Sequence, residues 1–335
     1  MLCNIYFGNI EEILLDGVFE IGSSRIIRGC SSTDCDAVLV QDKSDIHLLV
    51  RIVDDFLLIS TNKSTSARFM KKLNEGIPSL GVAINGDKSR VNYPLSLANT
   101  TTGKLGMVTA CHDLFPWCGL LIDTRTCEIS LDYKRFCGSH STDTVVIHRG
   151  GNEGLHLKKK LKDFVRPRCC QRLLFSSDVN RIDMIRLNFY QTFLLCAVKL
   201  VHYITSGSRE TSAQFIYDAA CDTIHFAFAL ISSKIQHGNW RASSSTNKRS
   251  LAFQLSWKDA LWLGRHAFRH VLRRQWSRKM RGRSESYIMD TQKVLLLLFS
   301  DSHRSLDAEG TPSTSAFEKD LLAVTRRARQ FPLNA

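Results

Sequence analysis

Two adjacent carboxylates, Asp54 and Asp55, interrupt the apolar stretch "IHLLVRIVDDFLLIS" that runs from Ile46 to Ser60. The apolar flanks predict two buried strands that meet at the acidic pair, because Asp tolerates the backbone angles of a two-residue turn. Two neighbouring carboxylates in a buried setting repel each other and lose hydration unless a positive charge compensates. Such a pair suits two Mg²⁺ ions, which take oxygen ligands and activate an attacking oxygen. A solvated turn without a metal is the alternative.

Two further short segments carry residues that suit catalysis or binding. Lys88 lies in the turn-like stretch "NGDKSRVNY", where a lysine near a departing pyrophosphate supplies a proton or neutralises charge. The alternative is a surface lysine beside Asp87. In "FPWCGLL", Trp117, Cys118 and Gly119 form one tight segment, and Gly119 permits a close backbone approach to a ligand. The alternative here is a core tryptophan followed by a bend in a strand.

Two stretches carry many cations with almost no acids, a pattern that indicates phosphate contact. In "LHLKKKLKDFVRPRCCQR" the candidate residues are Lys158, Lys159, Lys160, Lys162, Arg166 and Arg168. In "WKDALWLGRHAFRHVLRRQWSRKMRGR", Arg265, Arg269 and Arg273 recur every four residues on one face of a predicted helix. A single charged face is usually only solvated, so it is the presence of two such clusters that favours nucleic acid.

The chain as a whole is basic. Its 335 residues include 45 Lys+Arg against 32 Asp+Glu, a formal net charge of +13, which indicates a phosphate backbone or an anionic membrane as partner. The longest apolar stretch, which begins at Thr192, is interrupted by Lys199 and is too short to span a bilayer, and the N-terminus does not resemble a signal peptide. We therefore predict an intracellular protein without membrane contact. The 11 cysteines include no CxxC pair, which favours free thiols over zinc or a disulfide framework.

The hydrophobic period predicts an α/β half of about 145 residues followed by an all-helical half. The first half contains short strands, a Ser/Gly-rich hairpin or insert at about 19–45, and a helix capped by Ser64 or Thr65 that ends at Gly76. Further strands are predicted around "FPWCGLLIDTRTCEISLDY", with "DTRT" as a turn. The other helices are predicted at 1–18, 155–165, 183–204, 212–235, 256–276 and 316–331.

These segments, in this order, resemble telomerase reverse transcriptase. "LLVRIVDDFLLIS" is similar to catalytic motif C of that family, and "SARFMKKLNEGIPSLGVAINGDKSRVNYP" is similar to its motif D. "FPWCGLLIDTRTCEISLDY" is similar to motif E, the primer grip, and "HRGGNEGLHLKKKLKDFVRPRCC" with the helices after it is similar to the C-terminal extension, the thumb. The resemblance covers nearly the whole chain, except the segment at about 19–45 and the linkers.

The resemblance implies an α+β partial palm of a right-hand polymerase at residues 1–145, followed by an all-α thumb at 146–335. Asp54 and Asp55 then match the metal-site carboxylates, which hold two Mg²⁺ ions in the complete site. Lys88 matches the general acid for pyrophosphate departure. The residues that match the primer grip, which holds the DNA 3′ end, are Trp117, Cys118 and Gly119.

By the same resemblance we expect an RNA-directed DNA polymerase that copies telomerase RNA onto chromosome 3′ ends, in the nucleus at telomeres. Its partners would be telomerase RNA, the telomeric DNA 3′ end paired as an RNA–DNA duplex, and deoxynucleoside triphosphates. "MLCNIYFGNIEE" is similar to the middle of the family's motif B′ helix, so we expect the motif A aspartate and the fingers to be absent and the chain to be inactive alone. The alternatives are a retroelement-type reverse transcriptase and a non-catalytic module that binds RNA–DNA duplexes.

Overall fold

A computed structural model of the chain describes residues 8, 10, 18, 25–30, 35–42, 45–76, 81, 85, 88–95, 109–110, 113–133, 152–206, 210–238, 254–280 and 284–299. The chain divides into two compact units, Met1–Thr126 and Cys127–Ala335. The predicted domain boundary at 145/146 lies outside the described residues. The first unit mixes strands with helix and the second is mostly helical, so the predicted combination of small sheets with many helices is confirmed.

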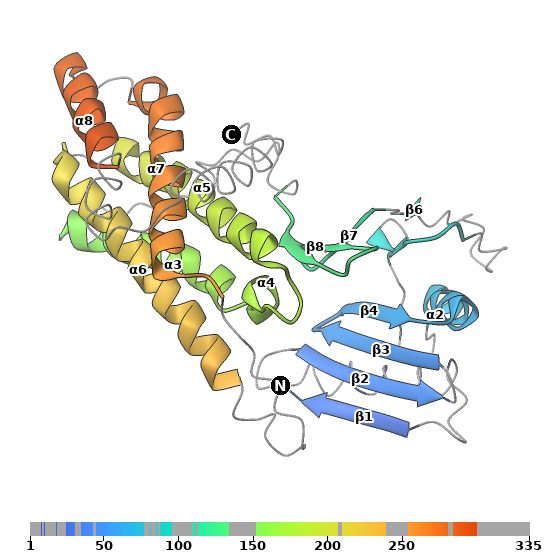
Figure 1. Ribbon diagram of the computed structural model, residues 1–335. Helices are drawn as coiled ribbons and strands as arrows, with labels where there is room; N and C mark the ends of the chain where they lie inside the picture. Colours follow the sequence, from blue (N-terminus) through green and yellow to red (C-terminus); the bar gives the residue numbers. More distant parts are fainter. Residues whose placement is uncertain are drawn as a thin grey trace. The chain divides into compact units, whose positions relative to one another are not determined.

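A four-stranded antiparallel sheet in the order β1-β2-β3-β4 forms the base of the first unit (Figure 1). Its strands are β1 (Arg25–Cys30), β2 (Cys35–Asp42), β3 (Asp45–Ile52) and β4 (Asp55–Ser60). The predicted hairpin near residues 19–45 is confirmed, but it contains two strands where the sequence pattern indicated only one. The extra strand, β1, is held by its ladder with β2, and such pairing gives a segment strand structure that its own side-chain pattern does not predict.

Helix α2 (Lys63–Glu75) follows β4 and contacts it. The side chain of Asn62 caps its first turn by accepting hydrogen bonds from the backbone N–H groups of Ser64 and Thr65. The predicted caps, Ser64 and Thr65, are therefore wrong, because Asn is an equally good cap and lies just before them. The predicted end is confirmed: Gly76 has φ 69°, a backbone conformation that glycine adopts without strain.

The core of the first unit lies between the sheet and α2. Leu49 of β3, Phe69 of α2 and Val18 are buried against one another. Val18 belongs to the predicted helix at 1–18, of which the structure describes three residues, all of them helical. The partly buried side chains that pack on this cluster are Phe56, Leu58 and Leu73.

Among the residues that the structure describes, the later part of the first unit contains short strands, as predicted. Strand β5 (Arg90–Val91) pairs in parallel with β6 (Thr109–Ala110). Strands β7 (Leu114–Trp117) and β8 (Leu120–Asp123) form an antiparallel hairpin. These two hairpin strands carry the segment that was predicted as a ligand contact.

The second unit begins with strand β9 (Ile129–Leu131) and continues as helices, which Figure 1 shows gathered in one bundle. The helices are α3 (Glu153–Cys169), α4 (Arg172–Phe175), α5 (Ile182–Ser206), α6 (Ala213–Gly238), α7 (Trp257–Lys279) and α8 (Glu285–Leu298). The four predicted long helices are thus confirmed as α3, α5, α6 and α7. Helix α8 was not predicted, because four consecutive leucines hide its helical period. The predicted helix at 316–331 lies outside the described residues.

Helix α5 is the centre of this bundle and is buried on nearly every side. Its Phe193 packs on Phe189 of the same helix, with ring centroids 4.9 Å apart, and on Phe268 of α7, at 6.1 Å. By length and composition alone, α5 and α6 are apolar enough to cross a membrane. In α5, 89% of that apolar window is buried inside the unit, and a helix that is hydrophobic all round is typical of a protein core as well.

Helices α6 and α7 approach each other closely at Gly264. A Cβ atom at this position would lie 2.6 Å from Cδ1 of Ile224 on α6, which is closer than real Cβ atoms come to other carbons. Both residues are buried, and a close-packed interior does not accommodate extra atoms without moving its neighbours.

We predict that Gly264→Val lowers the free energy of unfolding by about 1–3 kcal/mol, the usual cost of overpacking a core. Urea unfolding followed by circular dichroism measures this loss. Ala229→Val, which introduces the same side chain at an exposed position of α6, should change the value by less than about 0.5 kcal/mol. Adding Ile224→Ala to Gly264→Val should recover part of the loss, and an equal or larger loss in the double variant would contradict the proposed clash.

Candidate functional site

The two predicted carboxylates lie at the tip of the β3–β4 hairpin. Ile52 and Asp55 form the last pair of the ladder, so Val53 and Asp54 are the two turn residues and Asp55 begins β4. The predicted turn at Asp54–Asp55 is therefore wrong by one residue. Both carboxylates are exposed, so the expected buried setting is wrong.

The turn is strained, and a buried arginine, Arg51, donates a hydrogen bond to it. Val53 has φ 55°, a region that a β-branched residue rarely adopts because its side chain crowds the backbone. The side chain of Arg51 lies on the buried face of β3 and is only 2% exposed. Its guanidinium donates a hydrogen bond of 3.1 Å to the backbone carbonyl of Val53.

The predicted primer-grip segment forms a second tight hairpin. Trp117 pairs with Leu120, and the two residues between them, Cys118 and Gly119, have φ 48° and 79°. A two-residue hairpin with positive φ at both positions follows the natural twist of the strands. The Cys118 thiol donates a hydrogen bond to Oδ2 of Asp55 at 3.3 Å. The fold of the first unit therefore brings together two predicted site segments that are 63 residues apart in sequence.

The exposed carboxylates of Asp54 and Asp55 are the hard oxygen ligands that Mg²⁺ prefers, and their exposed position leaves room for water and phosphate ligands. Within the described part of the chain, no group of three or more His, Cys, Asp or Glu side chains is placed to hold a metal. The residues present thus fit part of a Mg²⁺ site, with two carboxylates as its ligands.

Lys88 is exposed in a short turn, where its backbone N–H donates to the carbonyl of Asn85 at 3.1 Å. It lies two residues before β5, and β5 packs beside β7. Among the described contacts, none joins the Lys88 side chain to Asp54 or Asp55. The structure thus places Lys88 in the same unit as the aspartates and leaves its side chain in solvent.

Several of the predicted phosphate-binding cations on α3 contact α6 within the bundle. The Lys158 ammonium forms a 2.8 Å ion pair with Asp222 and lies 5.4 Å from the centre of the Phe215 ring. Because both partners belong to α6, this lysine links the two helices. Such partly exposed contacts each contribute about 1 kcal/mol or less.

In the next turns of α3, cations again contact α6, here through an aromatic ring. The Lys162 ammonium and the Arg166 guanidinium lie 5.8 Å and 4.9 Å from the centre of the Phe226 ring on α6. Arg168 folds back on its own helix, where it donates to the carbonyl of Phe164 at 2.9 Å and covers that ring. These three cations therefore stabilise the bundle, whatever else they bind.

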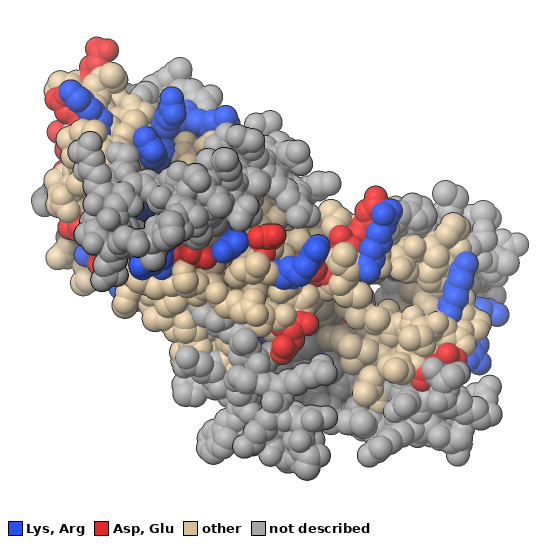
Figure 2. All heavy atoms as spheres, in the orientation of Figure 1, with Lys and Arg blue, Asp and Glu red and all other residues tan. Residues whose placement is uncertain are grey.

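On α7, the three predicted arginines differ in their surroundings. The guanidinium of Arg265 lies 5.5 Å from the centre of the Tyr217 ring on α6, whereas Arg269 and Arg273 are exposed. For Arg269, Arg273, Lys159 and Lys160, the described contacts include no ion pair or ring. Figure 2 shows Lys and Arg side chains interspersed with Asp and Glu on one face of the molecule.

The buried thiols of the second unit belong to its core. Burial raises the pKa of the Cys169 thiol to about 12 and raises the pKa of Cys196 as well. A thiol with a raised pKa stays protonated near neutral pH, and the protonated form is a poor nucleophile and a poor metal ligand. In the first unit, the thiol of Cys118 instead contacts a predicted site residue, Asp55.

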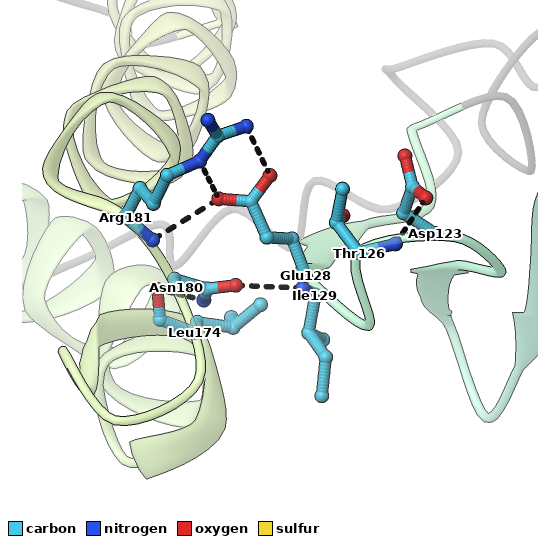
Figure 3. Close-up of polar contacts among 7 residues, drawn as sticks. All are labelled: Asp123, Thr126, Glu128, Ile129, Leu174, Asn180 and Arg181. Carbon is cyan, nitrogen blue, oxygen red and sulfur yellow. Dashed lines mark hydrogen bonds and ion pairs between the residues drawn. The ribbon is translucent and has the colours of Figure 1, made fainter.

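Two buried asparagines fix the strand that opens the second unit. The carboxamide oxygen of Asn180 accepts a 2.6 Å hydrogen bond from the N–H of Ile129, and its nitrogen donates to the carbonyl of Leu174 (Figure 3). The same nitrogen also donates to the carbonyl of Leu173. Asn188 donates to the carbonyl of Ile129 at 2.9 Å. Both backbone groups of Ile129 are thus satisfied by side chains, as buried polar groups require.

An ion pair within the second unit lies next to Asn180 in sequence and links the segment before β9 to the segment before α5. Glu128 is buried and accepts from the backbone N–H and the guanidinium of Arg181 at 3.0–3.3 Å (Figure 3).

In the turn at the end of the first unit, Asp123 accepts from the backbone N–H groups of Thr126 and Arg125. These hydrogen bonds lower the pKa of Asp123, because they stabilise its charged form.

Sequence reasoning missed Arg51 and the two asparagines. Arg51 had one signal, a charged residue inside a strand that is otherwise apolar, and such a residue on a buried face needs a specific partner. The sequence gives no signal for Asn180 and Asn188, because neither asparagine stands out from its neighbours and their partners, Ile129 and Leu174, lie elsewhere in the sequence.

Comparison with known proteins identifies a consistent set of relatives. The family model "Telomerase reverse transcriptase, C-terminal extension" matches residues 155–281. Telomerase reverse transcriptase of Arabidopsis thaliana is 27% identical over 83% of this chain and 24% of its own length. That of Canis lupus familiaris is 27% identical over 80% and 21%, and that of Mus musculus is 34% identical over 59% and 15%. The chain thus spans about a quarter or less of the length of these relatives.

We predict that Asn180→Ala lowers the free energy of unfolding of the second unit by about 2–4 kcal/mol. It leaves the N–H of Ile129 buried without its partner, at about 1–3 kcal/mol. It also removes the hydrogen bonds to the carbonyls of Leu173 and Leu174, although the Leu174 carbonyl still accepts from Asn188. Thermal unfolding measures the change. Gln171→Ala, an exposed helix cap whose side chain makes no capping hydrogen bond, is the matched control and should cost less than about 0.5 kcal/mol. Equal losses in the two variants would contradict the role assigned to Asn180.

Proposed function

Since the chain belongs to the telomerase reverse transcriptase family and matches its C-terminal portion, we propose that it forms part of an RNA-directed DNA polymerase. This polymerase adds telomeric repeats to chromosome 3′ ends by copying an RNA template, in the nucleus. Its partners are telomerase RNA, the DNA 3′ end and deoxynucleoside triphosphates. In this proposal the first unit contributes part of the palm and the second unit is the thumb.

The contact between Cys118 and Asp55 carries the proposal. A polymerase must hold the 3′-hydroxyl of the primer beside the acidic residues that bind metal, since reacting atoms must be about 3–3.5 Å apart. The 3.3 Å hydrogen bond supports a primer-grip role for Trp117, Cys118 and Gly119, because it links their turn to a candidate metal ligand. A match to telomerase reverse transcriptases also favours this family over a retroelement enzyme.

Asp54 and Asp55 would hold Mg²⁺ in this proposal. When bound, two Mg²⁺ ions supply positive charge to the attacking and leaving oxygens of nucleotide transfer. The turn residues 118–119 would position the primer end. Lys88 would donate a proton to the departing pyrophosphate oxygen as the bond from that oxygen to the α-phosphorus breaks. Its exposed side chain supports this role, because it is accessible to a bound triphosphate.

A second candidate function is a duplex-binding module without catalysis of its own. Four of the predicted phosphate-binding cations support it: Lys159, Lys160, Arg269 and Arg273, whose described contacts include no ion pair or ring. The described residues of this chain offer only two carboxylates to a metal. We therefore propose that the chain by itself binds an RNA–DNA duplex and adds no nucleotides to it.

We predict that Asp54→Asn and Asp55→Asn each weaken Mn²⁺ binding at the hairpin, where Mn²⁺ substitutes for Mg²⁺ and broadens nearby nuclear magnetic resonance signals. In a polymerase completed with the remaining part of a relative, the same changes should lower primer extension by several orders of magnitude, since metal charge contributes several kcal/mol. Asp290→Asn, an exposed aspartate of α8, is the control and should change neither quantity. Near-normal extension by Asp54→Asn would refute the assignment.

We further predict that the chain binds an RNA–DNA duplex with an affinity that falls as salt rises. For duplex DNA, log K falls with log salt by about 0.9 per phosphate contacted. Arg269→Ala with Arg273→Ala should reduce this slope by about 2 and weaken binding to all sequences alike. Lys293→Ala on α8, which also removes an exposed cation, is the control. A slope that the arginine variants leave unchanged would contradict this surface, and primer extension by the chain alone would contradict its proposed inactivity.

A further inference from the structure

We propose that Arg51 is a positioning residue, which holds the strained turn of the β3–β4 hairpin and thereby orients Asp54 and Asp55 toward a divalent cation. This inference deepens the proposed function and rests on it. Arg51 does not act on substrate; it acts through the backbone of the turn. Four observations carry it: the burial of the side chain, its hydrogen bond, the strain at Val53 and the register of the hairpin.

The burial of Arg51 is unusual for its residue type. Its side chain is 2% exposed and is among the largest fully buried side chains of the chain. A guanidinium carries a charge at any physiological pH, and removing it from water is costly unless hydrogen bonds replace its hydration. A buried arginine is therefore fixed in place by its partners, and one of those partners is the carbonyl of Val53.

That hydrogen bond acts on the strained peptide. Val53 has φ 55°, a conformation that costs a non-glycine residue about 1–3 kcal/mol and persists only where its surroundings impose it. The carbonyl that accepts from Arg51 belongs to the peptide bond between Val53 and Asp54. Fixing that carbonyl fixes the rotation of the peptide plane, and hence the direction in which the Asp54 side chain leaves the backbone.

The register of the hairpin extends this effect to Asp55. Ile52 pairs with Asp55 and Arg51 pairs with Phe56. These two pairs of the ladder fix both ends of the turn formed by Val53 and Asp54. Any other conformation at Val53 changes the relative direction of the two carboxylates. Arg51 also places a positive charge on the strand that ends at this turn, which opposes the repulsion between the two neighbouring carboxylates.

The test is a double-variant cycle in the full chain, with Arg51→Gln, Val53→Gly and their combination. Glycine adopts φ near +55° without strain, so Val53→Gly removes the need for the hydrogen bond. We expect Arg51→Gln to weaken Mn²⁺ binding at the hairpin about tenfold. Val53→Gly alone should change it less than about threefold, and in the Val53→Gly background the loss from Arg51→Gln should shrink to about threefold or less.

Hydrogen exchange of the β3–β4 amides provides a readout that needs no metal. Arg51→Gln should speed exchange at the tip of the hairpin about tenfold more in the parent than in the Val53→Gly background. Arg125→Gln, which removes an exposed guanidinium from the same unit, is the matched control and should change neither readout. If Arg51→Gln does not fold, Arg51→Lys replaces it in the cycle and should give a smaller loss with the same coupling to residue 53.

The outcomes separate the two proposals. Equal losses from Arg51→Gln in both backgrounds, or no loss in either readout, would overturn the positioning role. If Asp54→Asn and Asp55→Asn leave Mn²⁺ binding unchanged, the metal site of the proposed function fails. Hydrogen exchange then still decides whether Arg51 holds the turn.

Discussion

Repulsion between two adjacent carboxylates is the constraint around which the first unit is arranged. Two adjacent carboxylates are costly in an apolar interior, and at the tip of the β3–β4 hairpin both are exposed to solvent. Exposure reduces the cost but leaves the side chains free to rotate. Two neighbours limit that freedom: Arg51 holds the turn from the buried face of β3, and the Cys118 thiol donates to Asp55 from the adjacent hairpin.

Both hairpins use backbone conformations that most residues avoid. Val53 and Cys118 have positive φ without being glycine, and in each case the tight two-residue turn leaves the chain little alternative. Strain of this kind persists where the surrounding structure imposes it, and it clusters at functional sites. That the two strained turns belong to the two segments joined by the contact between Cys118 and Asp55 fits a site whose geometry matters more than its local stability.

In the second unit, several cations of α3 stabilise the helix bundle through contacts with α6. Helix α6 presents aromatic rings and an aspartate to its neighbours, and Lys158, Lys162 and Arg166 of α3 pack on them. The basic excess of the chain is therefore partly structural. A phosphate-binding surface on this unit would rely mainly on the cations that have no such contacts, which are fewer than the sequence clusters indicate.

At the start of the second unit, neutral side chains also serve the fold, by forming hydrogen bonds to the backbone of strand β9. A strand cannot satisfy its own backbone groups, and in β9 the side chains of Asn180 and Asn188 are the partners of the N–H and the carbonyl of Ile129. Because these side chains are buried, each hydrogen bond is both required and specific.

The sequence by itself determined the features that depend on neighbours in the chain: the acidic turn, the Trp117–Gly119 segment, the end of α2 at Gly76, the four long helices and the basic excess. Periodicity and turn chemistry act over a few residues and can be recognised without a fold. Tertiary structure alone decided that the carboxylates are exposed, that Cys118 reaches Asp55, that Arg51 is buried beneath the turn, and which cations of α3 and α7 contact α6. The reason is physical: what a charged or polar side chain does depends on the group that lies beside it, and here that group comes from a distant part of the chain.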